Sequence, residues 1–267
     1  MKIEKLTIIG GCGRNGQKES VDEVTLQMGN IISIVGPTGC GKTTLINDIE
    51  LFADDNTPSR RRVLINGIPR PVELMYDPAK NPIALISQHT NFLSDLPVKT
   101  FLEIHAGIRQ TGRREAVVEE TLEFANQLTG EPIIRESAMT ELSGGQTRAL
   151  LIADAVIIGN SPIILLDEIE NAGIHRTRAL ELLKKYEKIF IFVTHDPRIA
   201  LLSDFRITMK NGAMRSVIIT GDEERGVAEE LRKLDDLMLD FRNRIRDGEH
   251  LSDRLLKERL RALGYIA

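Results

Sequence analysis

Apolar residues follow two different patterns along the chain of 267 residues. Residues 163–166 and 189–193 are continuous apolar runs, and residues 31–35 are apolar apart from Ser33. All three are rich in isoleucine, as expected for strands buried on both faces of a parallel sheet. Residues 98–110 and 114–128 instead carry apolar side chains at helical spacing. Strands and helices in this succession predict an α/β fold.

The first thirty residues predict two strands around a glycine-rich turn. Residues 2–9 are strand-like, and the apolar residues of 17–30 recur mostly at a spacing of two. The intervening "GCGRNG" satisfies G-x-G-x-x-G, but a dinucleotide site needs a helix directly after its glycines. Since a strand follows, we reject a dinucleotide fingerprint and expect a loop.

From Gly221 onward the chain becomes charged and helical. Apolar residues recur there at a 3-4-3-4 spacing: Leu231, Leu234, Met238, Phe241 and Ile245. Gly248 ends this stripe, and Ser252 is placed to cap a shorter second helix. Because two heptads are too short for a free coiled coil, we expect a helical hairpin packed back on the preceding domain. The alternative is a dimerisation or partner-docking element.

The composition narrows the class of protein. Hydrophobic residues make up 42% of the chain and charged residues 28%, which is ordinary for a globular protein. A net charge of -4 argues against nonspecific attraction to nucleic acid, so no nucleic-acid partner is expected. With no long apolar run and no signal-peptide pattern, we expect a cytoplasmic location. Two cysteines suggest neither a disulfide framework nor a metal site, and Arg60–Arg62 and Arg113–Arg114 are interpreted as solvated surface.

The strongest local motif is "GPTGCGKT", residues 36–43, between a buried strand and a helix-compatible segment. It matches G-x-x-x-x-G-K-[ST], the loop that cradles nucleotide phosphates. Lys42 would supply charge to the outer phosphates, and the Thr43 hydroxyl would ligate Mg²⁺. We expect the nucleotide to be bound by this loop and the residue that follows it: Gly36, Pro37, Thr38, Gly39, Cys40, Gly41, Lys42, Thr43 and Thr44.

Two further motifs follow in residues 142–168. "IILLDE" is a buried strand ending in two carboxylates: Asp167 suits the Mg²⁺ shell, and Glu168 is placed to polarise an attacking water. "LSGGQ" puts a serine and two glycines before a helical segment, which predicts a second anion-binding helix N-terminus.

These motifs, in this order, resemble those of the ATP-binding-cassette (ABC) ATPases, and the resemblance covers residues 1 to about 220. It implies an ABC-type P-loop NTPase with an antiparallel β subdomain, an inserted helical subdomain at about 96–155 and a C-terminal helical extension, 221–267. It also implies that Mg-ATP is hydrolysed in a head-to-tail dimer. The second copy would close each site with its own Ser143, Gly144, Gly145 and Gln146.

The resemblance assigns two more polar residues at predicted strand ends. Gln88 corresponds to the family's glutamine that reaches Mg²⁺ and the lytic water, and His195, in "FVTHD", to the histidine that contacts the γ-phosphate. The loop from Asn91 to Asp95 corresponds to the segment that receives the partner. The apolar stripes after it are interpreted as core of the helical subdomain.

The sequence departs from the family in two places. Residues 169–174 are "IENAGI" where the family has Pro-Thr-Ser-Ala-Leu-Asp, which puts communication between the two sites of the dimer in doubt. No Phe, Tyr or Trp lies between residues 1 and 51 to stack on adenine. Arg14 could stack on the base instead. The simpler alternative, slightly favoured, is that residues 10–17 only form a turn.

Two functions remain open for the ATPase. The base rates of the family favour the ATP-binding subunit of a membrane transporter whose membrane-spanning subunits are separate chains, which would place it on the inner face of the membrane. The alternative is a soluble ABC ATPase that powers a cytosolic cofactor-assembly or enzyme-activation complex, and the two departures favour it mildly. In either case the partners include a second ATPase copy or a paralogue.

Overall fold

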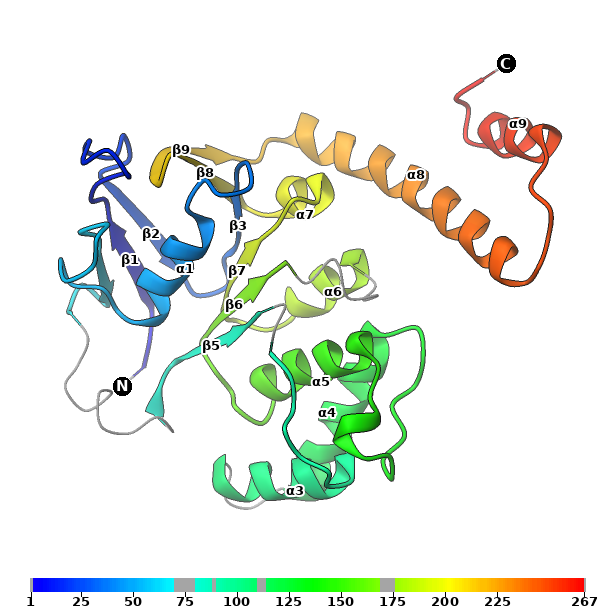
Figure 1. Ribbon diagram of the computed structural model, residues 1–267, viewed down its shortest axis with the longest axis horizontal. Coiled ribbons are helices and arrows are strands. Elements are labelled where there is room, and N and C mark those ends of the chain that lie inside the picture. Colours follow the sequence, from blue (N-terminus) through cyan, green and yellow to red (C-terminus); the bar gives the residue numbers. More distant parts are fainter. Residues whose placement is uncertain (1, 70–79, 88–89, 110–113, 169–175, 267) are drawn as a thin grey trace. The chain divides into compact units, whose positions relative to one another are not determined.

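The computed structural model describes residues 2–69, 80–87, 90–109, 114–168 and 176–266. The chain divides into two compact units, Met1–Ile219 and Thr220–Ala267, and each is described by itself (Figure 1). None of the helices in the described ranges is long and apolar enough to cross a membrane.

The centre of the first unit is a six-stranded sheet, in which all neighbouring strands are parallel except for the last, antiparallel pair. In spatial order the strands are β5 (Ile83–Ile86), β6 (Ile163–Asp167), β7 (Ile189–Val193), β3 (Ile31–Val35), β8 (Phe205–Lys210) and β9 (Ala213–Ile219). The buried parallel strands predicted at 31–35, 163–166 and 189–193 are the three adjacent strands β3, β6 and β7.

Both faces of this sheet are buried, which explains the continuous apolar runs. Successive side chains of β7 belong to two different hydrophobic clusters: Ile189, Ile191 and Val193 to one, and Phe190 and Phe192 to the other. The cluster that contains Phe190 joins the sheet to the helices, and the other joins it to the N-terminal strands and α1 (Lys42–Glu50). The sheet therefore separates two cores.

The N-terminal strands form a separate antiparallel sheet in the order β2-β1-β4. Its members are β1 (Lys5–Ile9), β2 (Glu23–Gln27) and β4 (Arg62–Ile65). The segment after the glycine-rich turn is thus strand β2, as predicted, and the rejection of a dinucleotide fingerprint is confirmed.

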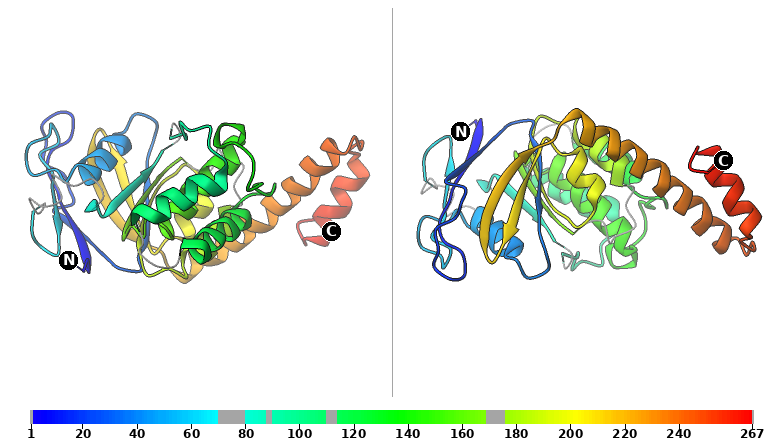
Figure 2. Two further views of the ribbon diagram at one scale, coloured as in Figure 1. Left: turned by 90° about the horizontal axis from the view of Figure 1, so that it is seen from below. Right: turned by 90° about the horizontal axis from the view of Figure 1, so that it is seen from above.

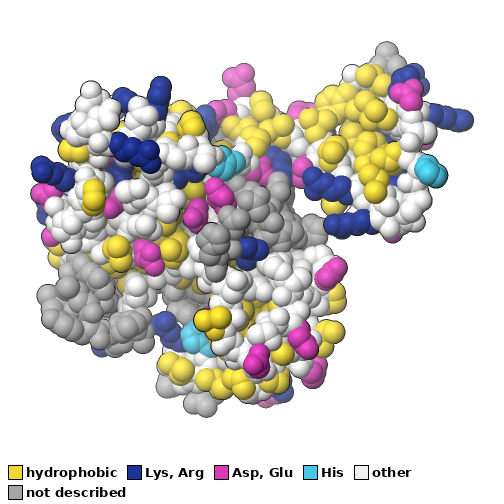
Figure 3. All heavy atoms as spheres, in the orientation of Figure 1, with side chains coloured by type: hydrophobic (Ala, Val, Ile, Leu, Met, Phe, Trp, Pro, Cys, Tyr) yellow, Lys and Arg dark blue, Asp and Glu magenta, His cyan; other side chains and the backbone are white. Residues whose placement is uncertain are grey.

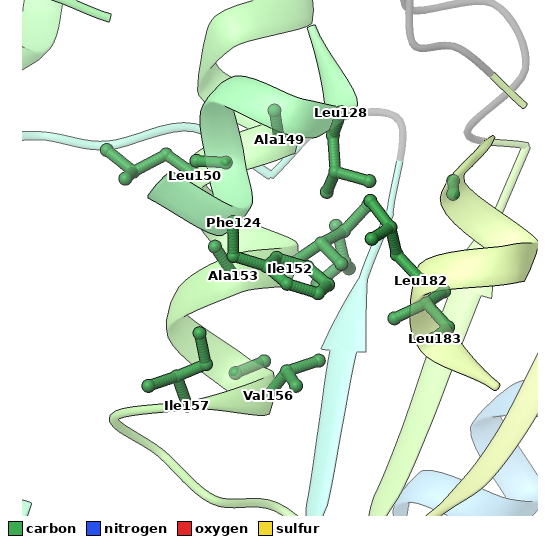
Figure 4. Packing of buried hydrophobic residues seen from close by; sticks show 14 of the residues in the cluster. Phe124, Leu128, Ala149, Leu150, Ile152, Ala153, Val156, Ile157, Leu182 and Leu183 are labelled. Carbon is green, nitrogen blue, oxygen red and sulfur yellow. The ribbon is translucent and has the colours of Figure 1, made fainter. Parts of the chain in front are cut away.

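The remaining helices of the first unit share the hydrophobic cluster on the opposite face of the central sheet (Figure 2). They are α3 (Val98–Arg109), α4 (Arg114–Leu128), the short 3-10 helix η2 (Met139–Glu141), α5 (Gly144–Val156), α6 (Arg176–Leu183) and α7 (Pro197–Leu202). Figure 4 shows how Phe124 and Leu128 of α4 pack against Ile152 of α5 and Leu183 of α6. The interpretation of the apolar stripes as core is therefore correct for α4, and for Leu102 of α3.

Two parts of the interpretation are wrong. Ile104 and Ile108 of α3 are exposed, because this helix buries only the face that carries Val98, Leu102 and Ala106. Arg61, interpreted as solvated surface, is completely buried, because it forms hydrogen bonds with two buried carboxylates. Its neighbours Arg60 and Arg62 are exposed; Arg113 lies outside the described residues.

The second unit is a hairpin of α8 (Asp222–Arg246) and α9 (Asp253–Ala262). The Tyr265 hydroxyl, beyond α9, donates to Glu230 of α8 at 3.0 Å, and Arg259 lies 3.3 Å from Asp240. The helix break at Gly248 and the cap at Ser252 are as predicted. Hydrophobic side chains gather on the surface of this unit (Figure 3). The exposed large hydrophobic residues of the two helices include Leu234, Met238, Ile245 and Leu256. Packing of the hairpin back on the first unit stays a prediction.

Candidate nucleotide-binding site

The candidate residues converge at one edge of the central sheet, where the parallel strands end. β3 leads into the phosphate loop (residues 36–43), β6 ends at Asp167, and β7 leads to His195. The register aligns these ends, since Val193 pairs with Asp167 on one side and with Ile34 on the other. In open α/β sheets this carboxyl edge is where ligands bind.

The phosphate loop curls around the amine of its own lysine. Lys42 is buried, and its Nζ donates to the carbonyl oxygens of Gly36 at 2.9 Å and Pro37 at 3.2 Å. Phosphate oxygens carry full negative charge and would be stronger acceptors than these carbonyl groups. Pro37, Thr38 and Gly39 are exposed at the rim, whereas Cys40 is buried. The sequence assignment of a phosphate cradle fits this geometry.

The loop ends where α1 begins, and this helix has no side-chain cap. Gly41, at the N-cap position, has a φ of 104°, a left-handed conformation that favours glycine. Gly41 has no side chain that could accept a hydrogen bond from the first turn, and Thr43 and Thr44 are exposed there. The first N–H groups of a helix lack intrahelical partners and carry the positive end of the helix dipole. The helix therefore presents a ready anion-binding end.

Glu168 and His195 meet across the ends of β6 and β7. His195 Nε2 lies 3.3 Å from Glu168 Oε1, and both side chains are partly exposed to solvent. Glu168 has a φ of 51°, a left-handed conformation that is uncommon for glutamate, and its N–H donates to the Val193 carbonyl. A strained backbone held by such a bond is typical of functional sites. Both residues were predicted from the sequence, whereas the contact between their side chains was not.

His195 is carried on a turn that two further residues stiffen. The Asp196 carboxylate caps α7 by accepting from the Arg198 N–H at 2.8 Å, and it also accepts from the Arg198 guanidinium at 2.8 Å. Both side chains are buried. Sequence reasoning passed over this pair, although Asp-Pro before an apolar segment is a recognisable helix start.

The oxygen donors at this edge suit a magnesium ion that is held mainly by a nucleotide. Thr43 offers a hydroxyl and Asp167 a carboxylate, both hard ligands of the kind that Mg²⁺ prefers. Among the residues that the structure describes, no group of three or more His, Cys, Asp or Glu side chains could hold a metal ion alone. Such a sparse protein donor set fits Mg²⁺, which usually keeps several waters and binds substrate phosphates. Gln88, the third predicted ligand, lies outside the described residues.

The segment "LSGGQ" begins α5 with a reciprocal cap. The Ser143 hydroxyl accepts from the Gln146 N–H at 3.3 Å, and the Gln146 amide oxygen accepts from the Ser143 N–H at 2.9 Å. Gln146 is further fixed by its bond to the Pro132 carbonyl. Ser143 and Gly144 are exposed, and α5 lies apart from α1 in Figure 1. This rigid helix start is therefore available to a second molecule.

The glycine-rich turn is linked to the phosphate loop by hydrogen bonds, which both segments make with the turn between β8 and β9. The Arg14 N–H donates to the Asn211 carbonyl at 2.9 Å, and the next residue, Gly212, donates to the Cys40 carbonyl of the phosphate loop at 2.7 Å. The Arg14 side chain is exposed. The predicted position of this turn beside the nucleotide is consistent with these bonds; residues 169–174 lie outside the described residues.

Comparison with known proteins agrees with this site. The sequence pattern of the family described as "ABC transporter" matches residues 21–171. An uncharacterised ABC transporter ATP-binding protein of Methanocaldococcus jannaschii is 49% identical over 94% of this chain and 96% of its own length. The chain belongs to the ABC transporter family. It is an ABC-type ATPase, the component that binds and hydrolyses ATP.

Other relatives of this ABC protein have named transport roles or known structures. The spermidine/putrescine import ATP-binding protein PotA of Bacteroides fragilis is 30% identical over 76% of this chain, but the match covers only 44% of PotA. A dimeric ATP-binding cassette bound to ADP and phosphate has a TM-score of 0.63 and 23% identity, over 81% of this chain and 99% of that one. CbiO1 of Clostridium perfringens, part of a transporter complex, has a TM-score of 0.61 and 21% identity, over 89% and 99%. At these identities the two structures show the ABC-type fold alone.

Proposed function

We propose that this chain binds Mg-ATP at the phosphate loop and hydrolyses it in a head-to-tail dimer, with Ser143–Gln146 of a second copy closing each site. The observation that carries the proposal is the convergence of the phosphate loop with Asp167, Glu168 and His195 at one sheet edge. The exposed, capped start of α5 supplies a matching surface for the triphosphate of a partner copy. The dimeric relative bound to ADP and phosphate is consistent with this arrangement.

Each residue has a defined task in the proposed reaction. Lys42 exchanges the carbonyl groups of Gly36 and Pro37 for phosphate oxygens and neutralises their charge. Glu168 accepts the proton of the attacking water. His195, 3.3 Å from the Glu168 carboxylate, orients this carboxylate and reaches toward the outer phosphate. Thr43, Asp167 and Gln88 would hold Mg²⁺, which when bound supplies charge compensation to the phosphates.

The hydrolysis cycle would drive a conformational change in a partner, and we propose separate membrane subunits of a transporter. The printed roles of PotA in import and of CbiO1 in a transporter complex support this class of partner. The proposed contact is the loop Asn91–Asp95, in which Leu93 is 99% exposed. The neighbouring helix α3 also exposes Ile104 and Ile108. Copurification with membrane subunits supports the transporter; copurification with a cytosolic complex alone supports the alternative.

The direct test of the nucleotide site is Lys42→Ala. Without the lysine, the backbone N–H groups alone leave the outer phosphate charge under-compensated, so ATP binding and hydrolysis should both be lost. Titration calorimetry with Mg-ATP and a phosphate-release assay measure the two effects. Unchanged affinity in the variant would show that the phosphate loop is assigned wrongly.

A further inference from the structure

A buried cluster of charges lies beneath the phosphate loop, and the hydrolysis scheme does not use it. It contains one cation, Arg61, and two carboxylates, Glu19 and Asp48, from three separate segments of the chain. Their side chains are 0 to 3% exposed. Burial opposes the charge on Arg61, yet its bonds to Glu19 and Asp48 outweigh this cost and raise its pKa above the usual value.

The guanidinium of Arg61 makes four hydrogen bonds. Nε and Nη2 donate to the two oxygens of Glu19 at 3.1 and 2.6 Å, and Nη1 donates to Asp48 at 2.8 Å. Nη2 also donates to the Gly212 carbonyl at 2.7 Å. A buried arginine that is bonded on every side holds its partners in one geometry, which a lysine with its single charged tip does not reproduce.

The bond to Gly212 leads directly to the phosphate loop. The Gly212 N–H donates to the Cys40 carbonyl at 2.7 Å, so a single residue, Gly212, connects Arg61 with the loop. Gly212 also packs against the backbone of Gly41: a Cβ on Gly41 would lie 2.8 Å from the Gly212 Cα. The turn between β8 and β9 thus packs against the phosphate loop and stabilises its conformation.

The carboxylates connect this cluster with α1, the glycine-rich turn and β9. Asp48 belongs to α1, the helix that the phosphate loop opens, and also accepts from the Ser59 hydroxyl. Glu19 accepts from the Gly11 N–H at 2.9 Å and the Met214 N–H at 2.5 Å, which binds the glycine-rich turn and β9. Gly11 has no room for a side chain there, since a Cβ would overlap the Ser59 carbonyl oxygen.

We propose that Arg61 is a positioning residue for nucleotide binding: through the Gly212 carbonyl and Asp48 it fixes the phosphate loop and α1 in the conformation that receives the phosphates. This inference rests on the proposed nucleotide site and adds a residue to it that does not touch the nucleotide. Because the bonds to Gly212 and Asp48 act on the phosphate end of the site, their contribution is the same for every nucleobase.

The first test is Arg61→Lys, which keeps the charge and loses the fixed geometry. We expect the dissociation constants for Mg-ATP and Mg-GTP to rise by the same factor, about tenfold, the size of losing one hydrogen bond to a charged group. The KM for ATP should rise in parallel, with kcat at saturation within about twofold, since the reacting groups stay in place. Equal affinities for the variant and the unaltered protein would overturn the proposal.

A second variant covers the case in which Arg61→Lys fails to fold. The triple replacement Glu19→Gln, Asp48→Asn and Arg61→Met removes all three buried charges together, and so leaves no carboxylate without a partner. It still lacks the bond to Gly212, and should show the same tenfold loss of affinity. Wild-type affinity in a folded triple variant would contradict the positioning role.

Two controls separate positioning from general destabilisation. Arg62→Met removes the neighbouring, exposed arginine, and Leu128→Ala removes a buried side chain from the helical core. Leu128→Ala should lower the melting temperature without raising the KM for ATP; an equal rise in KM would reduce Arg61 to a stability residue. If the unaltered protein itself does not bind Mg-ATP, the proposed nucleotide site fails, whereas the Arg61 inference alone fails if only the variants behave as wild type.

Discussion

Two residues at the sheet edge, Glu168 and Lys42, have a conformation or contacts that are best explained by a bound ligand. Glu168 has a left-handed backbone, and the Lys42 amine is bonded to carbonyl groups of its own loop. The Glu168 backbone is less favourable than the conformations that an unconstrained glutamate adopts, and phosphate oxygens would be stronger acceptors for Lys42 than carbonyl groups. We interpret them as a site built by its surroundings to receive a triphosphate.

Arg14 is the residue with the most open role. It is exposed in the glycine-rich turn, where its backbone is bonded to Asn211, and no aromatic residue precedes residue 52. If its guanidinium stacks on adenine, Arg14→Ala should weaken ATP binding by about 0.5–2 kcal/mol, the range of a cation–π contact. Catalysis at saturating ATP should change little.

Calorimetry with ATP and with GTP measures the Arg14 effect. Lys18→Ala, directly after this turn and also exposed, is the matched control. In contrast to Arg61→Lys, a stacking residue changes the ratio of the two affinities. If Arg14→Ala leaves both affinities unchanged, the turn has only a structural role, which is the simpler of the two interpretations.

At the scale of elements, Lys188 secures the start of β7. Its Nζ donates to the Asn160 side chain at 2.7 Å and to the Ser161 carbonyl at 3.1 Å, across the loop before β6. The lysine is only 6% exposed, and burial lowers its pKa from 10.5 to about 8. In the folded protein this lysine therefore loses its proton at a lower pH than in the unfolded chain.

This shift predicts how stability depends on pH. Between about pH 8 and 10.5 the unfolded chain binds more protons at Lys188 than the folded chain does, so raising the pH stabilises the fold. Relative to Lys188→Met, the free energy of unfolding of the wild type should rise across this window by at most about 1.4 kcal/mol per pH unit. Urea denaturation at several pH values measures it, with Lys185→Met as the control for an exposed lysine. A constant difference between wild type and Lys188→Met would refute the burial effect.

The elements also show which features the sequence could predict. The phosphate loop, the three central strands and the capped start of α5 follow from local patterns, because each is determined by neighbouring residues. The burial of Arg61 depends instead on Glu19, 42 residues earlier, and on the turn at Gly212, 151 residues later. Its neighbours in sequence are exposed arginines, so local composition predicted the wrong environment for Arg61.

The same limit applies to α3 and to the pair Glu168 and His195, which we propose to be catalytic. The face of α3 that becomes buried is determined by the position of α4, which packs against it. The spacing of apolar residues along the sequence does not indicate which face that is. Glu168 and His195 were selected separately by motif, whereas their contact results from the register of β6 against β7. Long-range geometry, rather than residue type, was the missing information.

At the scale of the whole molecule, the proposed function assigns two half-sites to one chain. The phosphate loop and the Glu168–His195 pair lie at the sheet edge, while the exposed start of α5 belongs to the helical layer. In the proposed head-to-tail dimer, the α5 start of each copy would lie on the nucleotide of the other, and ATP itself would be part of the interface. Dimerisation should therefore depend on ATP, and hydrolysis of ATP should cause the dimer to dissociate.

The most direct test of this account is size-exclusion chromatography of Glu168→Gln with and without Mg-ATP. The amide keeps the shape of the side chain but cannot accept the proton of water, so ATP should stay bound and unhydrolysed. We expect the variant to be a monomer without nucleotide and a stable dimer with Mg-ATP, and the added substitution Lys42→Ala to abolish the dimer. A Glu168→Gln protein that turns over ATP at the wild-type rate, or that binds ATP and stays monomeric, would contradict the account.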